Sequence, residues 1–138
     1  MENNQNLEQQ LSQYRYMKEQ QDMFQGQFEI INASLGNLYT TKLTLDNLKE
    51  GVNENDEILI PIGGLVNIKA TIKDTKKVLV YVQNDTVIEK TVEDAIEFIT
   101  SLIEQHNTQL NFLKERIYNL DLSIQSMNQM LQSRMTQQ

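Results

Sequence analysis

His106 is the only histidine in the sequence, and cysteine is absent. The chain therefore lacks thiolate ligands for zinc and cannot bind a metal ion through a pair of histidines. A Ser-His-Asp arrangement would have to use His106. This residue falls at a core position of a heptad pattern, where a neutral histidine can help to specify helix register. We interpret it as a helix-packing residue, and we expect neither catalytic residues nor a metal site.

Two other groups have residue types that chemistry uses but lack the required spacing. The carboxylates Glu54, Asp56 and Glu57 cluster before an apolar run, without a nearby histidine or the spacing of a metal-binding loop. We interpret them as a solvated loop. Gly63-Gly64 lacks the further glycine, lysine and hydroxyl residue of a phosphate-binding loop. We expect a hairpin turn there, no cofactor, and a protein that is not an enzyme.

The charge balance limits the classes of partner. Lys and Arg number 12, Asp and Glu number 19, and the net charge is −7. Binding to phosphate groups needs clustered basic side chains, so we expect neither a nucleic acid nor an anionic membrane as a partner. No run of 18 apolar residues could span a bilayer, and the polar start of the chain is unlike a signal peptide. These features predict a soluble protein of the cytoplasm.

The longest elements are predicted by heptad patterns at both ends of the sequence. Residues 1–50 carry two series with a seven-residue period, in which nine of twelve positions are apolar. The first series is Leu7, Tyr14, Gln21, Phe28, Leu35 and Lys42, and the second is Gln10, Met17, Phe24, Ile31, Leu38 and Leu45. In residues 92–138, ten of twelve such positions are apolar: Ile96, Ile99, Ile103, His106, Leu110, Leu113, Ile117, Leu120, Ile124, Met127, Leu131 and Arg134. Both segments are expected to be coiled-coil helices.

Residues 52–91 have a different pattern. Apolar, mainly β-branched residues alternate with other residues, which is typical of strands with one buried face. Pro61-Ile62-Gly63-Gly64 and Gln83-Asn84-Asp85-Thr86 interrupt the runs as hairpin turns. Asp74-Thr75-Lys76 is expected to link the two hairpins. Thr91 is a candidate N-cap for the helix that follows.

The simplest arrangement is one α+β domain over residues 1–138, in which the two helices form a long antiparallel coiled coil. The numbers of paired residues should then sum to about 141. Four short strands make too small a core to be stable alone. We therefore expect the hairpins of several subunits to close into a β-barrel. The alternative is that the hairpins fold back on the helices of a monomer.

The ends of the chain hold all six methionines, within about 25 residues of one terminus or the other. Flexible thioethers suit surfaces that accept varied apolar partners. Gln10, Gln21 and Arg134 also weaken the apolar helix pairing there. One interpretation is a tip that frays and exposes apolar groups to a client protein. The other is ordinary coiled-coil packing, with Met17 and Met127 between the helices.

The central segment resembles the α-type subunit of prefoldin, most closely the archaeal form. The resemblance rests on EILIPIGG at residues 57–64, on LVNIKATIKDTKKVLVYVQNDTVIEKT after it, and on VEDAIEFI at the start of the second helix. It extends over the whole chain as a helix, two hairpins and a helix. Two hairpins, rather than one, are the feature of the α class.

The resemblance implies a chaperone subunit that holds non-native proteins without ATP. Prefoldins are hexamers of two α-type and four β-type subunits, with a double β-barrel body and six coiled coils whose tips pass clients to a group II chaperonin. Carried onto this sequence, the oligomerisation residues are Ile58, Ile60, Ile62, Val66, Ile68, Ile72, Val78, Val80 and Val82. The client-binding tip residues are Leu7, Leu11, Tyr14, Met17, Met127, Met130, Leu131 and Met135.

Two other functions are compatible with the pattern of elements. The coiled coil could be a structural tether or adaptor that docks one native partner. Methionine-rich tips favour the more promiscuous holdase. An enzyme is disfavoured because the chain has no recognisable nucleophile, metal set or phosphate loop, and no room for a catalytic domain.

Overall fold

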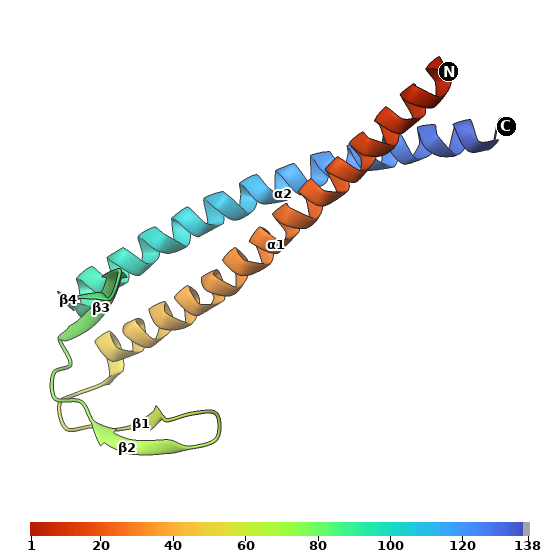
Figure 1. Cartoon of the computed structure of the whole chain (residues 1–138). Coiled ribbons are helices and arrows are strands. Elements are labelled where there is room, and N and C mark those ends of the chain that lie inside the picture. The colour runs from red at the N-terminus through yellow and green to blue at the C-terminus, as the bar shows by residue number, and fades with distance from the viewer. Residues whose placement is uncertain (137–138) are drawn as a thin grey trace. The chain divides into compact units, whose positions relative to one another are not determined.

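The computed structural model describes residues 1–136, which form two long helices and two hairpins in the expected order (Figure 1). Helix α1 is Glu2–Gly51, followed by strands β1 (Glu57–Pro61), β2 (Asn67–Thr71), β3 (Lys77–Gln83) and β4 (Thr86–Thr91), and by helix α2 (Val92–Thr136). Residues 137–138 of the predicted second helix lie outside the described part. Contacts divide the chain into a helix-only unit, residues 1–35 with 105–136, and a hairpin unit, residues 36–104.

In the helix-only unit, the predicted heptad positions lie where the two helices pack together. Each of these positions is buried or half-buried, from Leu7 to Leu35 on α1 and from His106 to Arg134 on α2. The most buried side chains, 4–8% exposed, are Leu35, Leu110, Leu113, Ile124 and Leu131. Sequence periodicity thus located this interface, because a seven-residue apolar repeat keeps one stripe of each helix facing the other.

Two contacts establish that the helices of this unit run antiparallel in the expected register. The Ser34 hydroxyl lies 3.1 Å from His106 Nε2. The Lys114 ammonium lies 5.9 Å from the centre of the Phe28 ring. The residue numbers of each pair sum to within one of the expected 141. His106 is therefore at a helix-packing position, half-buried and hydrogen-bonded to α1.

The hairpin unit has its own core at the adjoining ends of the helices. Its buried apolar side chains are Leu45, Val92, Ala95, Ile99 and Ile103. The backbone N–H of Asp94 donates to the Thr91 hydroxyl at 3.1 Å, which confirms Thr91 as the N-cap of α2. The N–H of Val92 donates to the carbonyl of Lys76 at 3.0 Å and joins the start of α2 to the linker between the hairpins.

Strands β1 and β2 form an antiparallel hairpin, with Ile58 opposite Ala70 and Ile60 opposite Ile68. The Ile62 N–H donates to the Val66 carbonyl at 2.9 Å, which extends the pairing just beyond the strands. Gly63, with φ of 104°, makes the turn in a conformation that side chains other than glycine rarely adopt.

Strands β3 and β4 form the second hairpin, with Val80 opposite Ile88 and a register shift between Tyr81 and Gln83. Asn84 and Asp85 both have positive φ, of 41° and 62°. Two such residues make the kind of tight turn that matches strand twist, so the predicted turn is confirmed. The linker before β3 is ordered by Asp74, whose Oδ1 accepts from the N–H groups of Lys76 and Lys77 at 2.8 and 3.3 Å.

The loop carboxylates before β1 are more structured than the sequence indicated. Asp56 Oδ2 accepts from the backbone N–H of Asn53 at 2.8 Å, and the Asp56 N–H donates to the Asn53 carbonyl at 3.1 Å. Asp56 therefore closes a turn after α1. Glu57 begins β1 and lies 3.8 Å from Lys69 on the neighbouring strand. Glu54 stays exposed.

Candidate functional site

The hairpins carry a large part of their apolar surface exposed. Among the nine residues predicted to build a barrel, none is fully buried. The half-buried ones are Ile58, Ile72, Val78, Val80 and Val82, and the exposed ones are Ile60, Ile62, Val66 and Ile68. The pairings of Ile60 with Ile68 and of Val80 with Ile88 place apolar side chains together on one face of each hairpin.

The opposite faces of the hairpins hold apolar residues that the sequence analysis missed. Leu59, Leu79, Tyr81 and Val87 are 64%, 70%, 76% and 41% exposed, and Leu65 at the first turn is 98% exposed. The sequence analysis expected one buried face for each strand and selected contact residues only from the alternating apolar series, so these positions were left out. Lys77 and Glu89, 3.9 Å apart, are the charged pair on that face of the second hairpin. Both faces are thus suited to contact another chain.

The second hairpin turns its other face toward α2. Lys90 of β4 lies 5.4 Å from the centre of the Phe98 ring, and both side chains are half-buried. Val78 and Val80, which share a face with Lys90, are half-buried as well. In the first hairpin only Ile58 and Ala70 are half-buried within the two strands. Isolated two-stranded hairpins are marginally stable, so the first hairpin has the greater need of a partner.

The predicted client-binding residues occupy two kinds of position in the helix-only unit. Leu7, Tyr14, Met17 and Met127 are half-buried between the helices, and Leu131 is only 8% exposed. Leu11, Met130 and Met135 face solvent, with exposures of 38%, 48% and 76%. These last three are the most accessible to a client while the helices stay paired. The half-buried ones are only partly accessible, and Leu131 becomes accessible only if the pair opens.

One polar atom weakens the packing near the chain ends. Gln10 lies at a helix-packing position, and its Oε1 atom is buried without a hydrogen-bond partner. A buried, unsatisfied carbonyl costs about 1–3 kcal/mol. Arg134 also occupies a half-buried position in the same stripe. These two residues make the ends of the helix pair easier to open than the part where Phe24, Ile31, Leu113 and Leu120 fill the equivalent positions.

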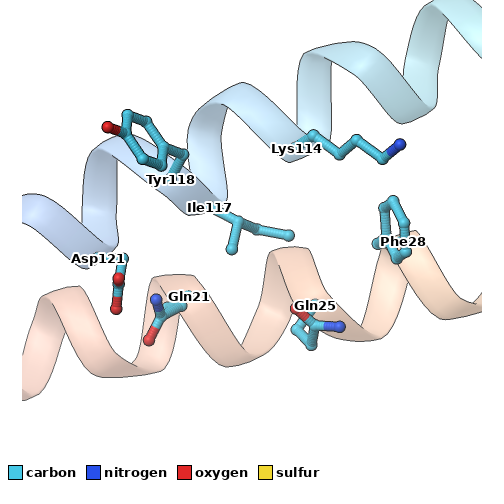
Figure 2. Close-up of a pocket in the computed structure, with 7 residues that line it drawn as sticks. All are labelled: Gln21, Gln25, Phe28, Lys114, Ile117, Tyr118 and Asp121. Atoms are coloured by element: carbon cyan, nitrogen blue, oxygen red, sulfur yellow. The ribbon is translucent and has the colours of Figure 1, made fainter.

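Two surface pockets lie on opposite sides of the helix pair. The first, of about 360 Å³, contains Gln21, Gln25 and Phe28 of α1 facing Lys114, Ile117, Tyr118 and Asp121 of α2 (Figure 2). It forms where Gln21 interrupts the apolar stripe. The second, of about 400 Å³, is lined by Gln13, Met17, Leu122, Ser123, Ser126, Met127 and Met130. Met17 and Met127 thus combine partial burial with access to a pocket.

Further exposed apolar side chains lie outside the helix-packing stripe, and the sequence analysis did not select them. Tyr16, Met23 and Ile30 of α1 are 61%, 47% and 72% exposed. On α2, Phe112, Tyr118 and Leu122 are 53%, 63% and 47% exposed. The available signal was the exact seven-residue spacing of Tyr16, Met23 and Ile30, which puts all three on the same side of α1, outside the packing stripe.

Residues 1–136 contain no cluster of three or more histidine or acidic side chains that could hold a metal ion. Within the same residues, neither helix combines the length and the apolar composition of a membrane span.

The model of the family described as "Prefoldin subunit" matches residues 17–137, nearly the whole chain. The chain belongs to the prefoldin family. The helix, two hairpins and helix found here are the elements expected from that resemblance.

Similar proteins place the chain with the α class of prefoldin. It is 26% identical over 123 residues to prefoldin subunit alpha of Pyrococcus horikoshii, covering 89% of this chain and 83% of that one. It is 33% identical over 101 residues to the α subunit of Methanococcus aeolicus, covering 73% and 67%. A filamentous prefoldin from Methanocaldococcus jannaschii, solved by cryo-electron microscopy, has the same fold, with a TM-score of 0.68, 23% identity and coverage of 82% and 93%.

Membership of the family gives the chain a prefoldin chaperone role. Prefoldins act by binding rather than by catalysis. The two exposed apolar regions, on the hairpins and on the helix pair, are therefore the candidate sites for assembly and for client binding.

Proposed function

We propose that this chain is the α-class subunit of a cytoplasmic prefoldin that holds non-native proteins without ATP and transfers them to a group II chaperonin. The observation that carries the proposal is the concentration of exposed apolar side chains in two places with different demands. The hairpins need a partner of fixed shape, whereas the methionine-rich ends of the helices suit variable ones.

Assembly with β-type subunits, two α with four β, is the role we assign to the hairpins. Their apolar faces, with Ile60, Ile68 and Leu79 among the exposed residues, have too little cover within one chain. Closure of several hairpins into a barrel would bury these faces and pair the strand edges. The same assembly would hold several helix pairs together around one client.

Client binding is the role we assign to the ends of the helix pair. Leu11, Met130 and Met135 offer exposed apolar contacts. Leu7, Tyr14, Met17, Met127 and Leu131 would add to them when the pair opens. Burial of one large apolar side chain contributes roughly 1.5–3 kcal/mol before ordering costs. Several such contacts in one assembly gain strength because later contacts are intramolecular. Each contact stays weak enough to exchange, so a chaperonin that competes for the client needs no nucleotide for release.

The experiment measures suppression of aggregation when a chemically unfolded test protein is diluted into the chain mixed with a β-type subunit, without ATP. The test variant lacks residues 1–17 and 127–138. A second variant keeps the full chain and replaces Leu11, Met130 and Met135 by serine, with Gln5, Gln129 and Gln132 replaced by serine as its control. Light scattering verifies the size of each assembly.

The truncated assembly should keep its number of subunits but no longer protect the test protein from aggregation. The apolar-to-serine variant should protect the test protein less well than its control does. Full protection by the truncated assembly would refute client binding at the tips. A tether would behave differently: it would bind one native protein saturably and show no preference for unfolded chains.

A further inference from the structure

The two flanks of the helix pair differ sharply in charge. One flank consists of the positions next to the packing stripe on one side. On α1 these are residues 6, 13, 20, 27 and 34 together with residues 9, 16, 23 and 30. On α2 they are residues 109, 116, 123 and 130 together with residues 105, 112, 119, 126 and 133. We call it the amide flank. Of the ten charged side chains between residues 6 and 34 and between 105 and 133, only Arg116 lies on it.

The contacts confirm that these positions of the two helices share one side. The pocket of about 400 Å³ brings Gln13 of α1 together with Ser123, Ser126 and Met130 of α2, all from the amide flank, beside Met17 and Met127 of the packing stripe. The pocket on the other side brings Gln25 together with Lys114 and Asp121. The charged flank in Figure 2 is therefore opposite to the amide flank.

The composition of the amide flank is distinctive. Its eighteen positions hold eight Asn or Gln residues, four serines, five apolar or aromatic residues and one arginine. The apolar ones are Tyr16, Met23, Ile30, Phe112 and Met130, and all five are exposed. The Arg116 guanidinium lies 5.1 Å from the centre of the Phe112 ring on its own helix. That stacking covers part of the single charge.

This composition matches the chemistry of a peptide backbone. A carboxamide carries both donors and an acceptor, so it can pair with the N–H and C=O groups of an extended chain whatever its side chains are. The interspersed apolar residues can cover apolar side chains of the same segment. A charged flank would have to be desolvated by such a segment at a large cost, whereas an amide flank would not.

We propose that the amide flank binds extended, uncharged segments of non-native polypeptide along the helix pair. This proposal rests on the holdase function proposed above and extends the client site from the ends of the helices to one side of them. The charge pattern favours this occupant over a charged partner, and the scattered apolar side chains, separated by amides and serines, lack the continuous ridge of a helix–helix interface.

The test uses the full chain assembled with a β-type subunit. The flank variant carries Gln13→Glu, Gln27→Glu and Gln109→Glu. The control carries Gln25→Glu, Gln129→Glu and Gln132→Glu, at exposed positions outside the amide flank. Both lower the net charge by three, so a difference between them reports the location of the charges. The probe is a fluorescent twenty-residue peptide with alternating apolar and Gln residues, compared with a version in which Lys replaces Gln at four positions.

Wild-type assembly should bind the Gln peptide more tightly than the Lys peptide, although the net charge of −7 on each copy of this chain attracts lysine. The flank variant should weaken binding of the Gln peptide about tenfold, and the control less than twofold. A photo-crosslinking residue should label the peptide from position 27 and not from position 25. These two positions lie only two residues apart, on opposite flanks of α1.

The outcomes separate this proposal from the one on which it rests. If wild-type assembly protects an unfolded test protein but the two triple variants bind the Gln peptide equally, the amide flank is not the site and the holdase function stands. Tighter binding of the Lys peptide, or crosslinking from position 27 to another copy of the chain, would also overturn the assignment. If wild-type assembly neither protects the test protein nor binds either peptide, both proposals fail.

Discussion

The hydroxyl of Ser34 and the Nε2 atom of His106 lie 3.1 Å apart, one on each helix of the pair. Both side chains are half-buried, so this polar contact sits beside the apolar stripe that holds the helices together. A polar pair at such a position can fix helix register, because a shifted register would leave both groups without this partner. The lone histidine of the chain thus lies at the helix-packing position that heptad spacing predicted.

Ser34→Ala should lower the free energy of unfolding by about 0.5–1.5 kcal/mol, the usual net contribution of one hydrogen bond. The matched control is Ser12→Ala, at an exposed position of the same helix. Both changes raise helix propensity equally, so their difference isolates the contact with His106. Urea unfolding of the assembled protein, followed by circular dichroism, measures it. Equal stability of the two variants would show that the hydrogen bond contributes nothing.

The helix pair was predictable in detail because heptad spacing states directly which side chains face the other helix. Gln10, Gln21 and His106 were placed at packing positions from spacing alone, despite being polar. The orphaned Oε1 atom of Gln10 was not predictable, because burial of a single atom depends on how neighbouring side chains fill the space around it. The same holds for the pocket beside Met17 and Met127.

The hairpins show where sequence analysis falls short. The strands and turns were close to prediction, since β-branched alternation and the Gly63 and Asn84-Asp85 turns are local signals. Leu79 and Tyr81 were not selected as contact residues, because alternation was taken to mean one apolar face that needs cover and one solvated face that does not. Strands whose faces await other chains break that assumption. The amide flank was missed for a related reason: it is recognised by the absence of charge on one side, which appears only once both helices are placed.

Gln10→Leu should stabilise the ends of the helix pair by removing a buried carbonyl that has no partner. The expected gain is about 1–3 kcal/mol for local opening. Hydrogen exchange at the amides of residues 7–17 in the assembled protein measures it. Gln5→Leu, at an exposed position, is the control for the added apolar surface. If client binding requires the ends to open, Gln10→Leu should also protect an unfolded test protein less well than its control. Unchanged hydrogen-exchange rates at these amides would mean that Gln10 does not weaken the pairing of the helix ends.

Gly63→Ala should destabilise the first hairpin, because φ of 104° is strained for any residue with a side chain. The expected cost is about 1–3 kcal/mol. The neighbouring change Gly64→Ala is the control, since that glycine does not have a positive φ and its added Cβ would meet nothing within 4 Å. Thermal unfolding of the assembly with a β-type subunit should show a lower midpoint for the first variant only. Equal unfolding midpoints for the two variants would show that the backbone conformation of Gly63 does not require glycine.

Ile60→Ser with Ile68→Ser should prevent assembly while leaving the helices intact. These two residues are paired across β1 and β2, are exposed, and form part of the apolar face assigned to contact other subunits. The loss of two large apolar side chains from a buried interface amounts to roughly 3–6 kcal/mol per hairpin. The control replaces Leu59 and Lys69, the neighbouring pair on the opposite face, by serine. Light scattering gives the size and circular dichroism the helix content. A full-sized assembly of the first variant would exclude this face from the interface, and a defect in the control alone would assign the interface to the other face.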